Sequence, residues 1–422
     1  MVRHGFAKAQ IRSSVSAALA SHQFRDRRSV RLVHLTTVPM SLRFLTGQPP
    51  YMSERGFEVQ AISSPGVELE GFSQREGVQV HAVPMERRIS PLRDLVALFR
   101  IWRTLRSLRP SIVHAHTPKA GLLGMIAARF VRVPVRIYHL HGLEFESRTG
   151  FLRWLLRFTD WVACALANRV LCVGRSTREG AIAEGICARQ KIRLLGGGSI
   201  NGVDTERFFP PDPASRHAAR AALGLSDQAF VVGFVGRVVR EKGIVELANA
   251  WRVLRDEFPH IRLLLVGPVE ARDPVPKEVL ERLKSDARVV IRGLDWETPR
   301  LYAAMDTLVL PTYREGFPVT LLEAGAMGLP VVATRIPGCA DAVVDGVTGT
   351  LVPARDASSF AAAIRRYCAN AELRRLHGRE ARVRILQHFR QETLWAATVE
   401  EYRALVAERG LATPDPPPLE GA

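Results

Sequence analysis

The chain has 422 residues, a formal net charge of +17 and 47% hydrophobic residues. This length exceeds that of one core of ordinary size, so the sequence predicts two domains of a soluble α/β protein. No apolar stretch runs uninterrupted for the roughly 18 residues that a membrane-spanning helix requires, because Arg153, Arg157, Asp160 and Arg169 interrupt the best candidate.

The positive charge is concentrated in the first part of the chain. Residues 1–200 hold 30 Lys and Arg against 13 Asp and Glu, so the remaining residues are neutral overall. A basic half predicts an acidic partner, which can be nucleic acid, anionic lipid or a phosphorylated substrate. No helix-turn-helix, zinc-finger or RNA-binding signature is present, which disfavours nucleic acid. We expect the anionic inner leaflet of a membrane and a phosphorylated acceptor, with charge scattered by an Arg-rich genome as the alternative.

The five cysteines form no Cys-x-x-Cys pair and have no histidine at metal-ligand spacing. We expect reduced thiols in a cytoplasmic protein, with no structural metal. The cysteines are Cys164, Cys172, Cys187, Cys339 and Cys368.

Residues 1–28 hold six basic residues but no apolar core of the kind that a secretory signal needs. We expect a poorly ordered basic arm, or a misassigned start codon. Over residues 29–205, short β-rich runs alternate with helical patterns, which predicts a first Rossmann-like domain with a parallel sheet. The predicted strands are 30–37, 58–63, 79–84, 111–116, 135–141 and 169–173, and the predicted helices are 41–55, 91–108, 120–130 and 151–167.

A Pro-rich stretch, Pro210-Pro211-Asp212-Pro213, marks the expected connection to a second domain over residues 206–390. There the alternation resumes, so we predict a second doubly wound domain. Predicted strands begin at Phe230 and continue with 262–266, 288–291, 307–310 and 331–334. Helices are predicted over 356–388 and 391–408, a C-terminal helical segment over 391–411, and a disordered tail over 412–422.

The predicted helix over 91–108 carries an apolar face with arginines on its flank or opposite side. Such a helix can lie at a lipid interface, or it can simply cover its own sheet. The sequence leaves both open. The apolar residues are Leu92, Leu95, Leu98, Phe99, Trp102 and Leu105, and the arginines are Arg93, Arg100 and Arg103.

Residues 307–330 predict a strand, a tight loop and a helix. The run 307–310 is apolar, Pro318 suits the first position of a helix, and Gly328-Leu329-Pro330 is a typical stop. The backbone N–H groups at the start of this helix would then lack partners within it and face the carboxyl edge of the sheet. They belong to Phe317, Val319, Thr320 and Leu321; Pro318, which lies between them, has no N–H. This loop, which includes Gly316, is a place to hold phosphate.

Two carboxylates, Glu315 and Glu323, flank this predicted phosphate site. Because carboxylates repel phosphate, we expect each to bind hydroxyl groups at one end of a ligand that has hydroxyls at both ends, such as a sugar nucleotide. The alternative is that Glu315 complements the helix dipole and that Glu323 is a solvated helix residue.

The loop Gly236–Gly243 follows the strand that begins at Phe230. Its glycines allow close approach of backbone to a ligand. Arg237 offers a forked donor and Lys242 a point charge for a diphosphate. A loose basic loop is the alternative.

The run Arg314–Thr334 resembles the Glu-(seven residues)-Glu motif of retaining glycosyltransferases of the GT-B fold, family 4, and 236–243 is similar to their Gly-Arg-x-x-x-x-Lys-Gly segment. The resemblance covers about residues 30–408. It implies two Rossmann-like domains facing each other across a cleft, with a last helix able to cross back to the first domain. It also implies that Arg237 and Lys242 hold the donor diphosphate.

The resemblance implies further site residues. Backbone near Arg292 and Leu294 would touch the base, with structural turns as the alternative. His141 would lie near the reacting sugar, although a lone histidine is more often structural. His116 and Lys119 would face the acceptor.

We therefore expect a metal-independent, cofactor-free, retaining hexosyltransferase that moves a sugar from a nucleotide diphosphate, UDP being the expected nucleotide. The expected acceptor is a lipid-linked saccharide or polyprenyl diphosphate in bacterial surface polysaccharide biosynthesis, at the cytoplasmic face of the cell membrane. Absence of Asp-x-Asp disfavours a metal-dependent GT-A enzyme, and absence of Gly-rich nucleotide motifs disfavours a dehydrogenase or P-loop protein. The alternatives are a GT-B sugar-nucleotide epimerase and a non-catalytic, membrane-associated binding protein.

Overall fold

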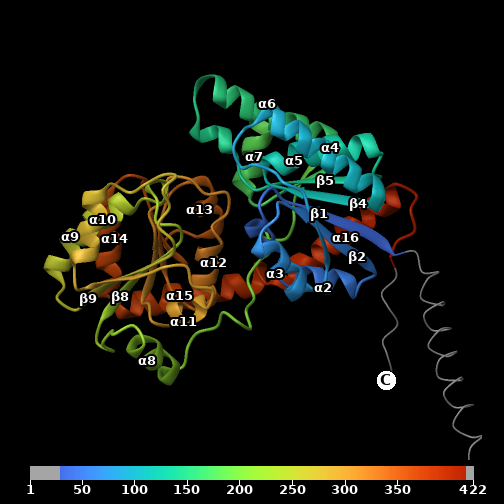
Figure 1. Ribbon diagram of the computed structural model, residues 1–422. Coiled ribbons are helices and arrows are strands. Elements are labelled where there is room, and N and C mark those ends of the chain that lie inside the picture. The colour runs from blue at the N-terminus through green and yellow to red at the C-terminus, as the bar shows by residue number, and fades with distance from the viewer. Residues whose placement is uncertain (1–28, 415–422) are drawn as a thin grey trace, which may run out of the picture. The chain divides into compact units, whose positions relative to one another are not determined.

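Two β-sheets flanked by helices organise the chain (Figure 1). The computed structural model describes residues 29–414. The first sheet has seven strands in the order β3-β2-β1-β4-β5-β6-β7, and the second has six in the order β10-β9-β8-β11-β12-β13. In both sheets the chain winds outward from its first strand in one direction and then in the other, which is the doubly wound arrangement. The predicted α/β class with two Rossmann-like sheets is confirmed.

The first sheet belongs to the N-terminal half of the chain. Its strands are β1 (Val30–Leu35), β2 (Phe57–Ser63), β3 (Gln79–Ala82), β4 (Ile112–His116), β5 (Val135–Leu140), β6 (Arg169–Cys172) and β7 (Ile192–Leu194). The α-helices of this half are α2 (Gln48–Ser53), α3 (Val67–Glu76), α4 (Pro91–Leu108), α5 (Pro118–Val131), α6 (Gly150–Leu166) and α7 (Arg175–Ala183), and the 3-10 helices are η2 (Pro39–Leu45) and η3 (Glu144–Ser147).

The second sheet follows the Pro-rich stretch. Its strands are β8 (Phe230–Val235), β9 (Ile261–Val266), β10 (Val289–Arg292), β11 (Thr307–Leu310), β12 (Val331–Thr334) and β13 (Gly349–Val352). The helices are α8 (Pro213–Ala221), η4 (Arg240–Lys242), α9 (Ile244–Glu257), α10 (Lys277–Ser285), α11 (Thr298–Ala303), α12 (Val319–Ala326), α13 (Pro337–Ala342), α14 (Ala357–Ala369), α15 (Ala371–His388) and α16 (Gln391–Glu408).

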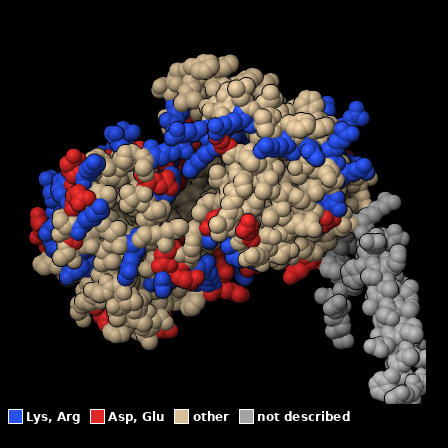
Figure 2. Space-filling view, viewed as in Figure 1, with Lys and Arg blue, Asp and Glu red and all other residues tan. Residues whose placement is uncertain are grey.

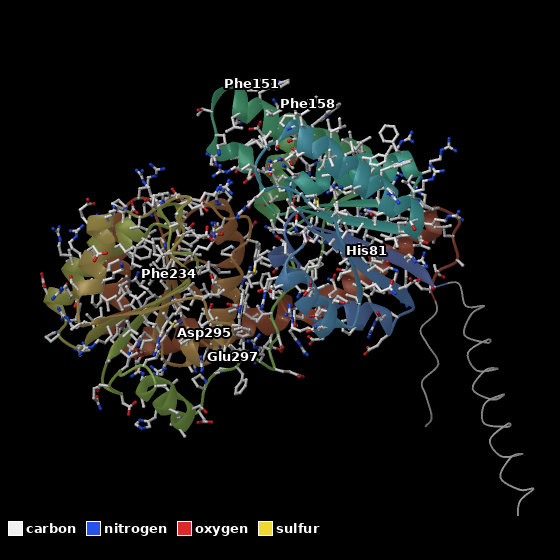
Figure 3. All side chains as sticks on the ribbon, viewed as in Figure 1. His81, Phe151, Phe158, Phe234, Asp295 and Glu297 are labelled. Carbon is white, nitrogen blue, oxygen red and sulfur yellow. The ribbon has the colours of Figure 1, made fainter. Side chains whose placement is uncertain are left out.

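Strand β8 shows why the second sheet forms its own core. Every residue of β8 is buried, and the strand pairs in parallel with β9 from Phe230 opposite Ile261 to Val235 opposite Val266. A strand buried on both faces must be apolar throughout, and β8 reads Phe-Val-Val-Gly-Phe-Val. Phe234, labelled in Figure 3, is fully buried in this core.

The described chain divides into two compact units that differ from the two sheets. One contains 29–114, 126–136 and 399–414, and the other contains 115–125 and 137–398. Helix α16 contributes to both. In the larger unit, Trp395 donates a hydrogen bond to the Asn201 side chain at 2.6 Å. In the smaller unit, the Tyr402 hydroxyl lies 2.6 Å from His114 Nδ1.

Several predicted elements differ from the observed ones. The predicted helix 41–55 is two segments, η2 and α2, because Gly47 between them adopts φ 81°. The predicted helix 356–388 is also two, because the Asn370 side chain accepts a hydrogen bond from the Leu373 N–H and caps α15. The sequence interpretation gave no ranges for α3, α7, β7, α8, α9, α10, α11, α13 and β13. The expectations for residues 1–28 and for the tail beyond 414 lie outside the described residues.

The protein buries only part of the apolar face predicted for α4. Ala97, Ile101 and Leu105 are buried, whereas Leu92 and Phe99 are exposed. Ala97, Ile101 and Leu105 therefore supply the packing, Leu98 and Trp102 are half-buried, and Leu92, Leu95 and Phe99 face solvent. Across residues 29–414, none of the helices combines the length and the hydropathy needed to cross a bilayer.

Candidate active site

The predicted donor loops follow β8 and β11, the strands at which the order of the second sheet reverses. Ligands of open α/β sheets bind at this switch point, outside the carboxyl ends of the strands. Strand β8 is followed by Gly236 and Arg237, and β11 by the loop that carries Glu315. These two segments are far apart in sequence, and the topology brings them to one edge.

Helix α12 begins one residue later than predicted. Pro318 occupies the cap position with φ −80° and ψ 101°, and the helix runs from Val319. The Leu321 N–H donates to the Pro318 carbonyl at 3.1 Å. Leu321 therefore does not offer a free amide, which corrects the predicted set. The Phe317 side chain is buried, so any ligand contact there would come from its backbone.

Lys242 and Glu315 form an ion pair between the two loops. Their side chains are only 15% and 13% exposed, so little water screens the pair. The Glu315 carboxylate thus binds the lysine that was predicted to bind phosphate. The ion pair orients both side chains.

Arg237 lies between two carboxylates that the sequence interpretation had not assigned to the site. It donates to Glu241 at 2.7 Å and to Glu270 at 3.0 Å. Arg314 approaches Glu241 at 3.5 Å. Three cations thus face three carboxylates around the edge of the sheet, once Lys242 and Glu315 are included. Glu241 lies beside Lys242 in the sequence, whereas no sequence signal marked Glu270.

Burial acts to raise the pKa of Glu241, but the charges of Arg314, Arg237 and Lys242 outweigh it and hold that pKa below its ordinary value. Glu241 therefore stays ionised. Its backbone carbonyl also accepts the Tyr313 N–H at 2.8 Å, which joins the two loops through main chain. The cluster is charge-balanced, and its ion pairs and this main-chain hydrogen bond hold it in place.

Close backbone packing places the Glu315 loop against the segment that follows β5. A Cβ at Gly316 would collide with the His141 carbonyl oxygen, so only glycine fits there. Gly243 is similarly constrained: it adopts φ 72°, and a Cβ would collide with the Pro311 carbonyl. These contacts lie within the larger unit, and they bring His141 and Glu315 to neighbouring positions.

His141 is one of three imidazoles that converge where β4 and β5 end. Its Nε2 lies 3.3 Å from His116 Nδ1, and its ring lies 4.8 Å from that of His139. Burial lowers the pKa of His141 to about 4. At neutral pH the imidazole is therefore uncharged and suits hydrogen bonding rather than proton donation. Three such nitrogens could also hold a metal ion, whereas the sequence interpretation expected a metal-independent site.

Glu323 lies in the second turn of α12 and contacts a buried tyrosine. The Tyr302 hydroxyl donates to Glu323 Oε2 at 2.7 Å. Burial raises the pKa of Glu323, and this hydrogen bond opposes the rise. Glu323 is thus not a solvated helix residue, and Tyr302 fixes the orientation of its carboxylate.

The remaining predicted residues differ in their exposure. Arg292 ends β10 and donates to the Ala222 carbonyl at 3.3 Å, and Leu294 is exposed. His116 is buried at the end of β4, and Lys119 is half-buried in the first turn of α5. No observed contact tests their assignment to base or acceptor, so these remain predictions.

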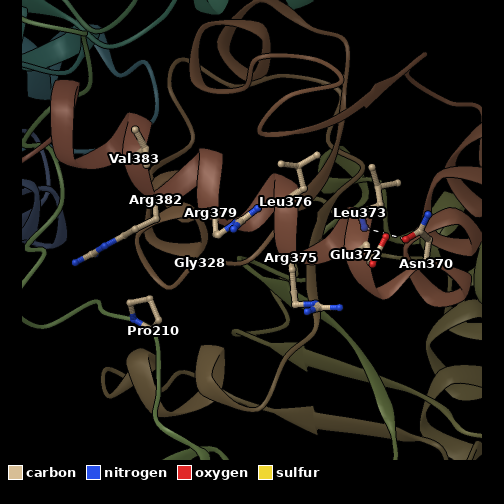
Figure 4. Close-up of a pocket in the computed structure, with 10 residues that line it drawn as sticks. All are labelled: Pro210, Gly328, Asn370, Glu372, Leu373, Arg375, Leu376, Arg379, Arg382 and Val383. Carbon is tan, nitrogen blue, oxygen red and sulfur yellow. Dashed lines mark hydrogen bonds between the residues drawn. The ribbon is translucent and has the colours of Figure 1, made fainter.

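A hollow of about 960 Å³ lies elsewhere on the larger unit, along α15 (Figure 4). Arg375, Arg379 and Arg382 line it together with Pro210, but none of the predicted site residues does. Arg382 is already engaged, since it donates to the Phe208 and Ala326 carbonyls at 2.7 Å each. The size of a hollow therefore does not locate the chemistry in this protein.

Comparison with known proteins agrees with the fold. Residues 229–370 match the family Glycosyl transferases group 1, and residues 50–198 match the Glycosyl transferase 4-like domain. A structure of HepE from Anabaena in complex with UDP and glucose superposes with a TM-score of 0.73 at 21% identity, covering 88% of this chain and 99% of that one. The architecture is therefore GT-B.

Two relatives extend over most of the chain. The capsular polysaccharide biosynthesis glycosyltransferase CapM of Staphylococcus aureus is 30% identical over 378 residues, 90% of this chain and 98% of CapM. The UDP-Gal:alpha-D-GlcNAc-diphosphoundecaprenol alpha-1,3-galactosyltransferase of Escherichia coli is 29% identical over 289 residues, 68% of this chain and 73% of that enzyme. The chain belongs to the family 4 glycosyltransferases of the GT-B fold.

Proposed function

We propose that this glycosyltransferase is a retaining, metal-independent hexosyltransferase that moves a sugar from UDP to a lipid-linked saccharide or polyprenyl diphosphate. The product would enter a bacterial surface polysaccharide. One observation carries the proposal: Arg237, Lys242 and Glu315 meet at the carboxyl edge of β8 and β11. The relatives named for capsule biosynthesis and for a diphosphoundecaprenol acceptor support the acceptor class.

The charged residues at the carboxyl edge of β8 and β11 suit the departure of a nucleotide diphosphate. Negative charge develops on the phosphates as the bond to the sugar breaks, and preorganised cations stabilise it. Arg237 and Lys242 are held in place by carboxylates before the donor arrives. In this proposal the diphosphate replaces those carboxylates as the partner of the two cations. Glu315, released from Lys242, then binds hydroxyls of the sugar.

The expected acceptor and the charge of the chain both support a location at a membrane. A polyprenyl-linked acceptor resides in a bilayer, and residues 1–200 carry the whole net charge of +17. Anionic headgroups attract such a surface. We place the enzyme at the inner face of the cell membrane, with exposed Leu92, Leu95 and Phe99 of α4 available for lipid contact.

A panel of UDP-sugars, assayed for UDP release with and without lipid-linked acceptors, tests the proposal. Acceptor-dependent release that persists after chelation is expected. A change of the UDP-sugar in the absence of acceptor would instead show an epimerase, and UDP-sugar binding without turnover would show a non-catalytic binding protein. Activity lost with chelator and restored by a divalent cation would reject metal independence and would direct attention to the three histidines.

A further inference from the structure

Helix α6 exposes a continuous row of aromatic side chains. Phe151, Trp154, Phe158 and Trp161 are 74%, 55%, 45% and 48% exposed. Their spacing of three, four and three residues places them on one face of the helix. We call these four residues the α6 aromatic row. Large apolar side chains gathered in this way mark an interaction surface rather than ordinary exposure.

The aromatic rings contact one another along the helix. The centroids of Phe151 and Trp154 are 5.7 Å apart, those of Trp154 and Phe158 5.5 Å, and those of Phe158 and Trp161 5.9 Å. The middle pair is stacked within 4° of parallel. The row is therefore a preformed apolar strip, which costs little side-chain entropy to bury.

The opposite face holds α6 on the protein without help from the aromatic row. Asp160, Ala163 and Cys164 are buried. The Tyr138 hydroxyl donates to Asp160 at 2.9 Å, and Arg153 donates to Glu184 at 2.6 Å. Removing the outer aromatic side chains should therefore leave the fold intact.

The charges of α6 fit an anionic surface. Its single acidic residue, Asp160, is buried on the inner face, while Arg157 within it is exposed and donates to the Glu184 carbonyl at 2.6 Å. Just before the helix, Arg148 is exposed and follows the exposed Glu144 and Glu146 of η3. Figure 2 shows the surface over α6 as largely uncharged, with Lys and Arg beside it, and Figure 3 shows Phe151 and Phe158 projecting from the helix. An apolar strip rich in Trp and Phe with basic neighbours is the composition of helices that lie in a membrane interface.

We propose that α6 lies in the membrane interface and inserts the α6 aromatic row at the boundary between headgroups and acyl chains. This inference rests on the proposed function, because a lipid-linked acceptor requires the enzyme at a bilayer. It adds to the proposed function a specific element, α6, and a specific force, the burial of apolar side chains, which salt does not screen. The electrostatic attraction of the basic half acts beside it and is screened by salt.

The test compares binding of the full chain to phosphatidylcholine vesicles containing phosphatidylglycerol, at low and high salt. The variants are Phe151→Ser/Trp154→Ser and, as a control with exposed apolar residues elsewhere, Phe209→Ser/Leu386→Ser. The wild type and the control should keep a salt-resistant part of binding, and the α6 variant should lose it, with a partition coefficient about tenfold lower or more. Acyl-brominated lipids should quench wild-type tryptophan fluorescence, and Trp154→Phe/Trp161→Phe should bind normally with less quenching.

Three outcomes would overturn the inference: no vesicle binding by the wild type, equal binding by the α6 variant, or a change only in oligomeric state, which would mean that a second copy covers the row. Failure of the proposed function has a different signature. If no sugar is transferred yet the α6 variant still loses vesicle binding, the docking surface stands and the assigned reaction falls. Transfer to a water-soluble, short-chain acceptor should be unchanged in the α6 variant.

Discussion

Lys242 and Glu315 form an ion pair although 73 positions separate them in the sequence. The lysine ends η4 after β8, and the glutamate belongs to the loop after β11. Adjacent parallel strands place these two loops side by side. The cation expected at the phosphates and the carboxylate expected at the sugar therefore position each other.

Glu315→Gln should keep the fold and UDP binding but lose most sugar transfer, because the neutral amide neither pairs with Lys242 nor binds the sugar as a carboxylate. Initial rates and UDP affinity measured on the same preparation check this. Glu257→Gln is the control, since it alters an exposed carboxylate paired with Arg365 on another surface. Near wild-type turnover of Glu315→Gln would refute the assignment.

Arg237→Ala or Lys242→Ala should cost about 2 to 4 kcal/mol of transition-state stabilisation, the scale for losing one preorganised donor to developing charge. The measurement is kcat/KM for the UDP-sugar. The double variant should lose less than the sum, because both cations act on one diphosphate. Arg240→Ala, an exposed arginine of the same loop, should change kcat/KM little. An equal loss in that control would indicate a general effect of loop charge.

Glu270→Gln should tighten UDP binding. Glu270 competes with the diphosphate for Arg237, and both side chains of the pair are about one-third exposed. Pairs with this exposure contribute up to about 1 kcal/mol, so a gain in affinity of a few fold is expected by calorimetry. Glu278→Gln on α10 is the control for a general loss of negative charge. Weaker binding in Glu270→Gln would show that this carboxylate supports the Arg237 geometry instead.

Glu323→Ala should weaken UDP binding by about 1.5 to 3 kcal/mol, the scale of a hydrogen bond to a charged group. Tyr302→Phe should have a smaller effect that grows as pH falls. The lost hydrogen bond normally opposes the burial that raises the pKa of Glu323, so without it the carboxylate becomes protonated at higher pH. UDP affinity measured across pH for both variants checks this. A pH profile identical to that of the wild type would contradict the role of Tyr302.

Asp160→Asn should change how stability depends on pH. Burial raises the pKa of Asp160 to about 7, with the Tyr138 hydrogen bond opposing the rise. The folded state therefore holds a proton that the unfolded state releases near pH 4, so stability from this group is full at low pH and falls as pH rises toward 7. The slope is about 1.4 kcal/mol per pH unit in that range. Urea unfolding of wild type and variant from pH 4 to 8 should show the difference, and parallel curves would reject it.

The sequence determined the architecture because hydrophobic patterning is local. Buried parallel strands such as β8 and β11 must be continuous apolar runs. The alternation of strands and helices could therefore be predicted from the sequence alone. The donor loops could be predicted for a similar reason: Arg237 and Glu315 each lie in the loop that follows a predicted strand, at a predictable edge. Elements with weak patterns, such as the three-residue β7, or a break made by one side chain, as at Asn370, were not readable.

Only the tertiary structure decided which charges meet and which apolar face stays outside. The pairing of Arg237 with Glu270 depends on β8 and β9 lying adjacent, and the Tyr302–Glu323 hydrogen bond depends on the packing of α11 near α12. Periodicity likewise shows that a helix has an apolar face but not what covers it. In α4 the protein buries Ala97 and Ile101 and leaves Phe99 exposed, and in α6 it buries Asp160 and leaves Trp154 exposed. Burial is a property of neighbours in space, which a linear pattern does not specify.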